Sequence, residues 1–232
     1  MFDMATGGSA KTGVGNKARS QGKDTARVLR LVLCGLLVFG GFMTTSQPTS
    51  AFTVERDTNH LMISGKIGPE SASVFNRNLV EALLDLAFTG DRDSPVHLHL
   101  DLPHGGLADV SFHIVDIMKR AQTQGTRFAA HVGPEASCMS GCTFLFLAAD
   151  ERWIAPEGRL IFHGFANPDG TSVKKIPVKY ARDYYGLLKF ANTRFYEFFK
   201  QSRIIEDDKK VGFTGTTLFN QTAFAGLITG LK

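Results

Sequence analysis

The stretch VHLHLDLPHGG, from Val96 to Gly106, holds a complete strand and the turn that ends it. Apolar and polar residues alternate as far as Leu102, so one face of the segment can be buried while His97 and His99 point the other way. The two glycines that follow permit a sharp turn, because a positive φ costs glycine nothing. The segment therefore predicts a β-strand that ends in a tight turn.

Segments with a helical spacing of apolar residues lie on both sides of this strand. They cover Glu70 to Ala87 before it and Leu107 to Ala121 after it, where Gly125 closes the helix. Further strands are expected at residues 60–67, 126–132, 152–155 and 158–165, a loop at 133–139, and helices at 141–149 and 178–201. Strands that alternate with helices are typical of βαβ units, so we expect an α/β fold with a largely parallel sheet.

The surplus positive charge of the chain is concentrated at its beginning. Of 26 basic and 22 acidic residues, six and two precede residue 52, so residues 52–232 carry 20 of each. A balanced domain lacks the basic surface that binds a phosphate backbone, and we expect no nucleic-acid partner. With 43% hydrophobic and 21% charged residues the chain has a globular composition, which argues against a disordered or multi-span membrane protein.

Residues 1–51 are typical of a targeting segment. Basic, Gly- and Ser-rich residues precede the apolar run Leu31–Met43, which at 13 residues is shorter than the roughly 20 that span a bilayer. The run fits the apolar region of a signal peptide, with cleavage expected after Ala51. An uncleaved anchor through residues 31–43 is the alternative, and only that anchor would touch a membrane. In both cases we expect residues 52–232 to form one exported, periplasmic domain.

Two cysteines remain once the leader is removed. Cys138 and Cys142 are four residues apart, and one helical turn would place their Cα atoms about 6 Å apart, within the range of a disulfide. In an oxidising compartment we expect them to pair, with two buried thiols as the alternative. Because no His or Asp lies at ligand spacing around them, we expect no metal site, and no cofactor is indicated.

Ser140 stands between these cysteines at the start of a predicted helix. In parallel α/β folds the ligand site lies beyond the carboxyl ends of the strands, and the loops at residues 102–106 and 136–142 both have that position. N–H groups at a helix start attract an anion, and an oxyanion is one such anion. Ser140, followed by Gly141, is therefore a candidate nucleophile; the alternative is a helix-capping serine without chemistry.

Three motifs in their order resemble the ClpP-like serine peptidases of the ClpP/crotonase superfamily. They are LPHGG before an amphipathic helix, then CMSGCTFLFLAADERWIAPEGRLIFHGF, then LFNQTAFAGLIT, and together they cover about His60 to Thr229. The chain resembles more closely the exported members, whose serine lies in a Cys-x-Ser-x-Cys setting. The resemblance implies stacked ββα units around a largely parallel sheet.

The resemblance also implies the roles of individual residues. They are Ser140 as nucleophile, His163 as general base, and Gly105 and Gly141 as the sources of two oxyanion N–H groups. An acid that orients the histidine falls in QSRIIEDD, which favours Asp208 with Asp207 as the alternative. Pro103 and His104 replace the Ser-Pro that precedes the glycines in the family.

The remaining histidines are interpreted as structural or solvent-facing. They are His97, His99, His104, His113 and His131, and a contact of His104 with substrate is the alternative for that residue. The segment YYGLLKFANTRFYEFF, residues 184–199, has aromatic residues on more than one face of its predicted helix. Core packing accounts for one face, and we expect the surplus to form the interface of a homo-oligomer.

Three functions follow from these observations. The leading hypothesis is an exported serine hydrolase, a peptidase that cleaves peptides or unfolded segments through an acyl-enzyme on Ser140. It would act without ATP, because the chain has no Gly-x-x-x-x-Gly-Lys-Ser/Thr loop. The alternative is a catalytically silent binding or assembly module with the same fold. A crotonase-type acyl-thioester enzyme is less favoured, because coenzyme A is cytosolic.

Overall fold

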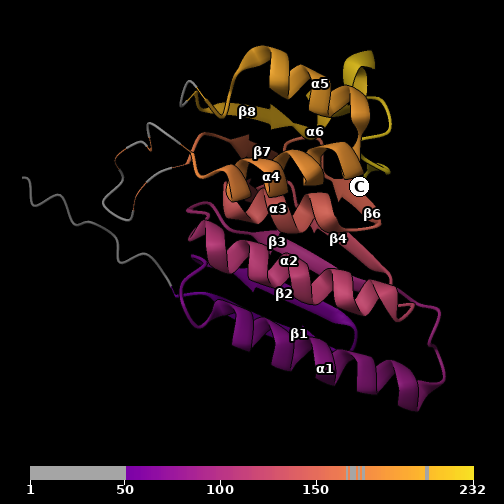
Figure 1. The fold of residues 1–232 in the computed structure, drawn as a ribbon. Coiled ribbons are helices and arrows are strands. Elements are labelled where there is room, and N and C mark those ends of the chain that lie inside the picture. Colours follow the sequence, from indigo (N-terminus) through magenta and orange to yellow (C-terminus); the bar gives the residue numbers. More distant parts are fainter. Residues whose placement is uncertain (1–50, 166, 168–170, 172, 174–175, 207–208) are drawn as a thin grey trace, which may run out of the picture. The chain divides into compact units, whose positions relative to one another are not determined.

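The computed structural model describes residues 51–232 apart from 166, 168–170, 172, 174–175 and 207–208 (Figure 1). Within these residues the strands are β1 (Thr53–Asp57), β2 (His60–Ser64), β3 (Val96–Asp101), β4 (Phe128–Val132), β5 (Ser137–Met139), β6 (Glu151–Ile154), β7 (Arg159–Phe162), β8 (Val211–Thr214) and β9 (Gly230–Leu231). The helices are α1 (Ser71–Thr89), α2 (Ala108–Thr123), α3 (Gly141–Ala148), α4 (Val178–Ala191), α5 (Thr193–Ser202), α6 (Gly215–Asn220) and a 3-10 turn at Thr222–Phe224. None of the helices in these residues has the length and apolarity needed to cross a bilayer. The predicted leader lies outside the described residues.

The larger sheet confirms the predicted α/β architecture. Its strand order in the described part of the chain is β1-β2-β3-β4-β6-β9. Strands β2, β3, β4, β6 and β9 run parallel, while β1 pairs with β2 in the antiparallel direction. Parallel neighbours need a crossover connection, and α1, α2 and α3 lie in three of these crossovers.

A smaller sheet, with the order β5-β7-β8, begins where β3 ends. A bridge between Leu102 and Cys138 joins the end of β3 to β5, and a carboxylate oxygen of Asp101 accepts a hydrogen bond from the N–H of Ser137 (3.1 Å). The stretch at residues 133–139, which we expected to be a loop, thus contains a three-residue strand. Its partners on both sides fix this strand, and three residues are too few for an alternation to be visible in the sequence.

Helices α1, α2 and α3 lie side by side over one face of the larger sheet (Figure 1). The side chains of Val96, Leu98 and Leu100 point toward this helical layer and are at most 1% exposed. Their neighbours His97 and His99 point to the opposite face and are half-buried. The alternation predicted for this strand is confirmed, and it gives the sheet one apolar and one polar face at this point.

The segment at residues 178–201, which we expected to be one helix, is broken into α4 and α5. Asn192 separates them in an extended conformation, and its side-chain oxygen accepts a hydrogen bond from the N–H of Phe195 (2.9 Å), which caps the start of α5. The change of direction places Phe195 and Phe199 in the core, where neither is exposed. Many aromatic residues expected at an oligomer interface therefore pack within the chain, whereas Phe190 remains 60% exposed.

Candidate active site

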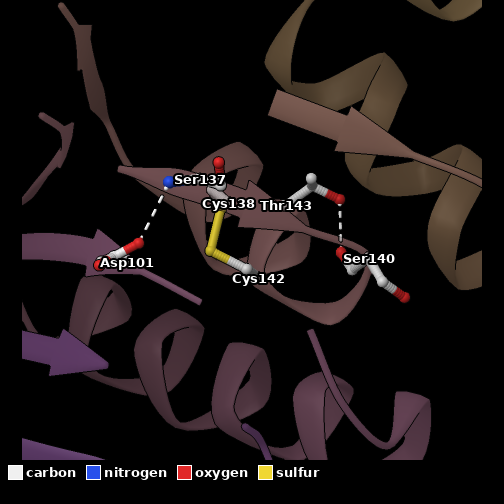
Figure 2. The surroundings of a disulfide bond; sticks show 6 residues. All are labelled: Asp101, Ser137, Cys138, Ser140, Cys142 and Thr143. Carbon is white, nitrogen blue, oxygen red and sulfur yellow. Dashed lines mark hydrogen bonds between the residues drawn. A yellow bond between two sulfur atoms is a disulfide. The ribbon is translucent and has the colours of Figure 1, made fainter. Parts of the chain in front are cut away.

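Ser140 occupies the sharp connection between β5 and α3. Its backbone lies at φ 53° and ψ −118°, a region that side-chain-bearing residues rarely adopt and that costs about 1–3 kcal/mol. A strand-to-helix turn of this kind exposes the hydroxyl of the residue at its tip. In Figure 2 the hydroxyl of Ser140 points away from the neighbouring disulfide. We call the segment from Ser137 to Thr143 the elbow.

Hydrogen bonds hold the elbow in this conformation. The N–H of Ser140 donates to the carbonyl oxygen of Ile161 at the end of β7 (2.9 Å). The carbonyl oxygen of Ser140 accepts from both the N–H (2.8 Å) and the hydroxyl (2.6 Å) of Thr143 (Figure 2). Both polar backbone groups of Ser140 are therefore satisfied, which explains how an unfavourable φ persists.

Cys138 and Cys142 form the predicted disulfide, with their Cα atoms 5.2 Å apart (Figure 2). Cys138 lies in β5 and Cys142 in the first turn of α3, so the bond links the two arms of the elbow across Ser140. Neither cysteine is exposed. Among the described residues, no group of three or more His, Cys, Asp or Glu side chains is placed to hold a metal ion.

Glycines allow the turn after β3 and the mouth of α3 to pack closely. A Cβ atom on Gly105, whose φ is +57°, would lie 2.6 Å from the carbonyl oxygen of Met139 and 2.7 Å from the Cβ of Ser140. A Cβ on Gly141 would lie 2.1 Å from the hydroxyl oxygen of Ser111. All three distances are far below a van der Waals contact, so a Cβ atom at either position would force its neighbours to move.

One of the two N–H groups available to bind an oxyanion differs from the predicted pair. The N–H of Gly105 already donates to the carbonyl oxygen of Leu102 (3.0 Å), so its predicted role is disfavoured. The next residue, Gly106, lines the same cavity as Ser140, and its N–H has no hydrogen-bond partner among the described residues. The N–H of Gly141, at the first position of α3, likewise has none there.

Ser140 and His163 both line a cavity of about 1000 Å³ at the carboxyl ends of the strands. His163 directly follows β7, and its Nδ1 lies 2.5 Å from the carbonyl oxygen of Gly164. A carbonyl can only accept, so Nδ1 carries a proton, and in the neutral imidazole this leaves Nε2 as an acceptor. The described residues include no hydrogen bond between Ser140 and His163. The structure thus brings the two expected residues to one cavity without joining them.

The other expected site residues have different positions. His104 lines the cavity, as does Gly106. Asp208 and Asp207 lie outside the described residues. His113 lies in α2 and lines a second, separate cavity of about 560 Å³ between α2 and α4.

Aromatic side chains form one wall of the cavity. Phe144 of α3 and Tyr180 of α4 both stack on Phe112, with ring centroids 4.6 and 5.9 Å away. Tyr184 also lines the cavity; burial raises its pKa, although its hydrogen bond with Thr143 acts in the opposite direction. It therefore stays a neutral phenol, and the wall can accept apolar side chains.

Comparisons with known proteins agree with this architecture. No family model matches the chain, and no curated protein matches it. Among solved structures it is similar to a ClpP1 variant from Listeria monocytogenes, with a TM-score of 0.52 and 17% identity over 76% of this chain and 92% of that one. The fold is ClpP-like. A variant of the membrane-bound stomatin-specific protease 1510-N also matches, with a TM-score of 0.49 and 19% identity over 74% of this chain and 77% of that one.

On the other face of this ClpP-like sheet the structure reveals a group that the sequence reasoning missed. Four imidazoles pack together there, which we call the four-histidine cluster: His60, His97, His99 and His131. Burial lowers the pKa of His97 to about 4 and that of His131 to about 3. Alternation places His97 and His99 on this face of β3, but only the pairing of His60 with His97 and of His99 with His131 brings all four together.

Proposed function

We propose that the protein is a serine hydrolase, a ClpP-like peptidase that cleaves peptides or unfolded segments through an acyl-enzyme on Ser140. The observation that carries the proposal is the elbow. It places a serine with a positive φ at the mouth of a helix with an unpaired first N–H, in a cavity that His163 also lines. A helix-capping serine needs none of these features, and its side chain would accept a bond from the helix start, which Ser140 does not do.

In the proposed reaction His163 acts as the general base. Its Nε2 removes the proton of the Ser140 hydroxyl as the oxygen attacks the carbonyl carbon of the peptide bond. The bond from Nδ1 to the carbonyl oxygen of Gly164 holds the imidazole in the tautomer that this step needs. The protonated His163 then donates its proton to the leaving amine as the C–N bond breaks, which leaves the acyl group on Ser140. His163 next takes a proton from a water molecule that attacks the acyl carbon, and returns it to the oxygen of Ser140 as the ester bond breaks.

The N–H groups of Gly141 and Gly106 stabilise the oxyanion that forms in each step. Gly106 and Ser140 line the cavity, and an aromatic wall that partly excludes water there would strengthen such hydrogen bonds. In this proposal Gly105 is not an oxyanion donor. It lets the turn approach the elbow so closely that Gly106 and Ser140 can share one cavity.

A fluorophosphonate probe tests this function, because it reacts with an activated serine and mimics the tetrahedral intermediate. We expect the purified, oxidised protein to be labelled on Ser140, and Ser140→Ala to abolish labelling. Ser137→Ala is a matched control, because the hydroxyl of Ser137 belongs to the same elbow and makes no hydrogen bond among the described residues. A folded, oxidised protein that resists labelling would instead be a silent binding or assembly module. Acyl-thioester turnover that survives Ser140→Ala would establish the crotonase-type reading.

The proposal places the domain outside the cytosol. The support is the leader-like composition of residues 1–51 and the disulfide across Ser140, since disulfides persist in oxidising compartments. Cell fractionation followed by N-terminal sequencing distinguishes a cleaved periplasmic form from one anchored by residues 31–43. Recovery of the full-length protein in the cytosol with two free thiols would overturn this part.

We also propose that the protein self-associates, and that it does so through α1 rather than through residues 184–199. Val80, Leu84 and Phe88 follow one another at helical spacing along its outer side and are 48%, 51% and 86% exposed. Contiguous exposed apolar side chains mark interaction sites, and a second copy of the chain is the partner we propose. Sedimentation of the wild type and of Phe88→Glu tests it: we expect an oligomer that the charged variant dissociates, and a monomeric wild type would refute it.

A further inference from the structure

The disulfide of the elbow is in an unusual place for a bond that serves stability. It joins residues separated by only four positions, and the chain-entropy gain from a cross-link decreases as the closed loop becomes shorter. Its two sulfur atoms lie in a core already filled by neighbouring apolar side chains, since neither Cys138 nor Cys142 is exposed. Chain entropy and core filling therefore account for little of what this bond contributes.

Locally, the bond fixes the two ends of the strained turn at Ser140, between β5 and α3. On one side Cys138 is held in β5 by its pairing with Leu160 and its bridge to Leu102. On the other side Cys142 belongs to the buried first turn of α3. Between them Ser140 has a φ of 53°, which a side-chain-bearing residue leaves when its surroundings no longer enforce it.

The hydrogen bonds of the elbow act on the peptide groups of Ser140, and the disulfide adds a constraint of a different kind. The N–H of Ser140 is bound to β7 and its carbonyl oxygen to Thr143, which fixes the two peptide groups but leaves the separation of the arms to packing. The disulfide is the covalent constraint on that separation, with Cα atoms 5.2 Å apart. It lies on the opposite side of the elbow from the hydroxyl, as Figure 2 shows, so it can brace the elbow without blocking the cavity.

We propose that Cys138 and Cys142 are positioning residues whose disulfide holds the hydroxyl of Ser140 and the N–H of Gly141 in their reactive places. This inference rests on the proposed hydrolase function and makes it dependent on redox state. A dithiol reductant would supply two electrons and two protons: the S–S bond breaks, two S–H bonds form, and the reductant becomes a disulfide. The elbow then relaxes toward a negative φ, and the nucleophile moves away from its oxyanion donors.

The test compares the oxidised and the dithiothreitol-reduced wild type in fluorophosphonate labelling, with thiols counted by mass spectrometry and folding followed by circular dichroism. We expect the maximal labelling rate to fall by about 10- to 100-fold on reduction, because small misplacements of reacting groups have effects of this size. The probe concentration for half-maximal rate should change little, since the cavity wall is intact. Reoxidation should restore the rate.

Two variants complete the experiment. Cys138→Ala with Cys142→Ala removes the bond without a reductant and should reproduce the slow labelling. Leu79→Ala destabilises the buried side of α1, remote from the elbow, and should label at the wild-type rate while it remains folded. This control separates a loss of position from a general loss of stability.

The outcomes distinguish the two proposals. If the oxidised wild type is not labelled, the hydrolase function fails. If the oxidised and the fully reduced protein are labelled at the same rate, the function stands and the positioning role is overturned. If Leu79→Ala is slowed as much as the cysteine variants, the disulfide acts only through stability and the positioning role is likewise refuted.

Discussion

The elbow and the four-histidine cluster differ in how they use reactive groups. In the cluster, ring nitrogens of His60 and His99 lie 2.9 Å apart, as do those of His97 and His131, and the rings stack on one another. At the elbow, Ser140 lines a cavity, and its hydroxyl and the N–H groups of Gly106 and Gly141 have no partner among the described residues. The comparison teaches that free donors and acceptors at a cavity, and not the number of reactive residues, identify the candidate site.

Burial accounts for the behaviour of the cluster. It is the largest cause that lowers the pKa of His97, and the charges that His60 and His99 would carry add to the effect. For His131 burial is again first, followed by the positive charge of Lys232. His97 and His131 therefore remain neutral near pH 7 and contact each other, which is the behaviour of a structural element.

The largest effect that we predict separates the two groups of histidines directly. His163→Gln removes the only base that we assign to Ser140, so the labelling rate or peptidase activity should fall by about 10⁴-fold or more. His99→Gln is the matched control in the cluster and should leave activity within a factor of about two, because it does not line the cavity. Comparable losses in both variants would break the distinction between site and cluster.

Gly105→Ala tests whether the close contact between the turn after β3 and the elbow is needed for activity. Gly105→Ala would push a methyl group against the Met139 carbonyl and Ser140, and we expect labelling to slow by about 100-fold. Gly90→Ala is the control: it has the same kind of positive φ, at +75°, with nothing within 4 Å of the added atom. It should cost about 1 kcal/mol of stability and leave the rate unchanged. Equal rates for the two variants would show that the contact with the elbow has no catalytic consequence.

A third variant tests how His163 is oriented. Because the carbonyl of Gly164 already accepts the Nδ1 proton, we expect Asp208→Asn to reduce activity by less than about tenfold. In a triad whose acid fixes the tautomer, the same change costs about 10⁴-fold. A loss of that size would show that Asp208 is the third catalytic residue, as the resemblance implies, and that the contact with Gly164 is replaced during the reaction.

Much of the fold and part of the site were predictable from the sequence. Alternation in β3 and helical spacing around it specify the parallel sheet, and a serine before glycine at a helix start specifies the elbow's position. The sequence does not show which strands pair with one another or in which register. The positive φ of Ser140, the three-residue β5 and the difference between Gly105 and Gly106 all depend on partners that are distant along the chain.

The break in the long helix and the four-histidine cluster have the same explanation. Asn192 is tolerated within a helical pattern, and its action as a cap for α5 depends on the tertiary packing of Phe195 and Phe199. Histidines on neighbouring strands become a cluster only through the strand register, which alternation alone does not give.

The smallest effect that we predict concerns the stability of the cluster in acid. The pKa values of His97 and His131 are lowered in the folded protein, to about 4 and about 3, from the ordinary value of 6.5. At pH values between about 3 and 6.5, these two histidines bind more protons in the unfolded chain than in the folded one. Their contribution to the free energy of unfolding is therefore complete above about pH 6.5 and declines as the pH falls toward 3. Positive charges on His60, His99 and Lys232 lower the pKa of His97, and the negative charge of Glu151 raises it.

Urea unfolding at pH 7, 5 and 4 measures this decline. In His97→Gln with His131→Gln we expect a shallower loss of stability between pH 7 and 4 than in the wild type, because two groups with lowered pKa values are absent. The fluorophosphonate labelling rate at pH 7 should stay unchanged in this variant, since neither residue lines the cavity. If the variant retains the wild-type pH slope, carboxylates elsewhere in the chain dominate the acid response. If labelling falls instead, the cluster is coupled to the elbow, and the two regions act as one site on opposite sides of the same sheet.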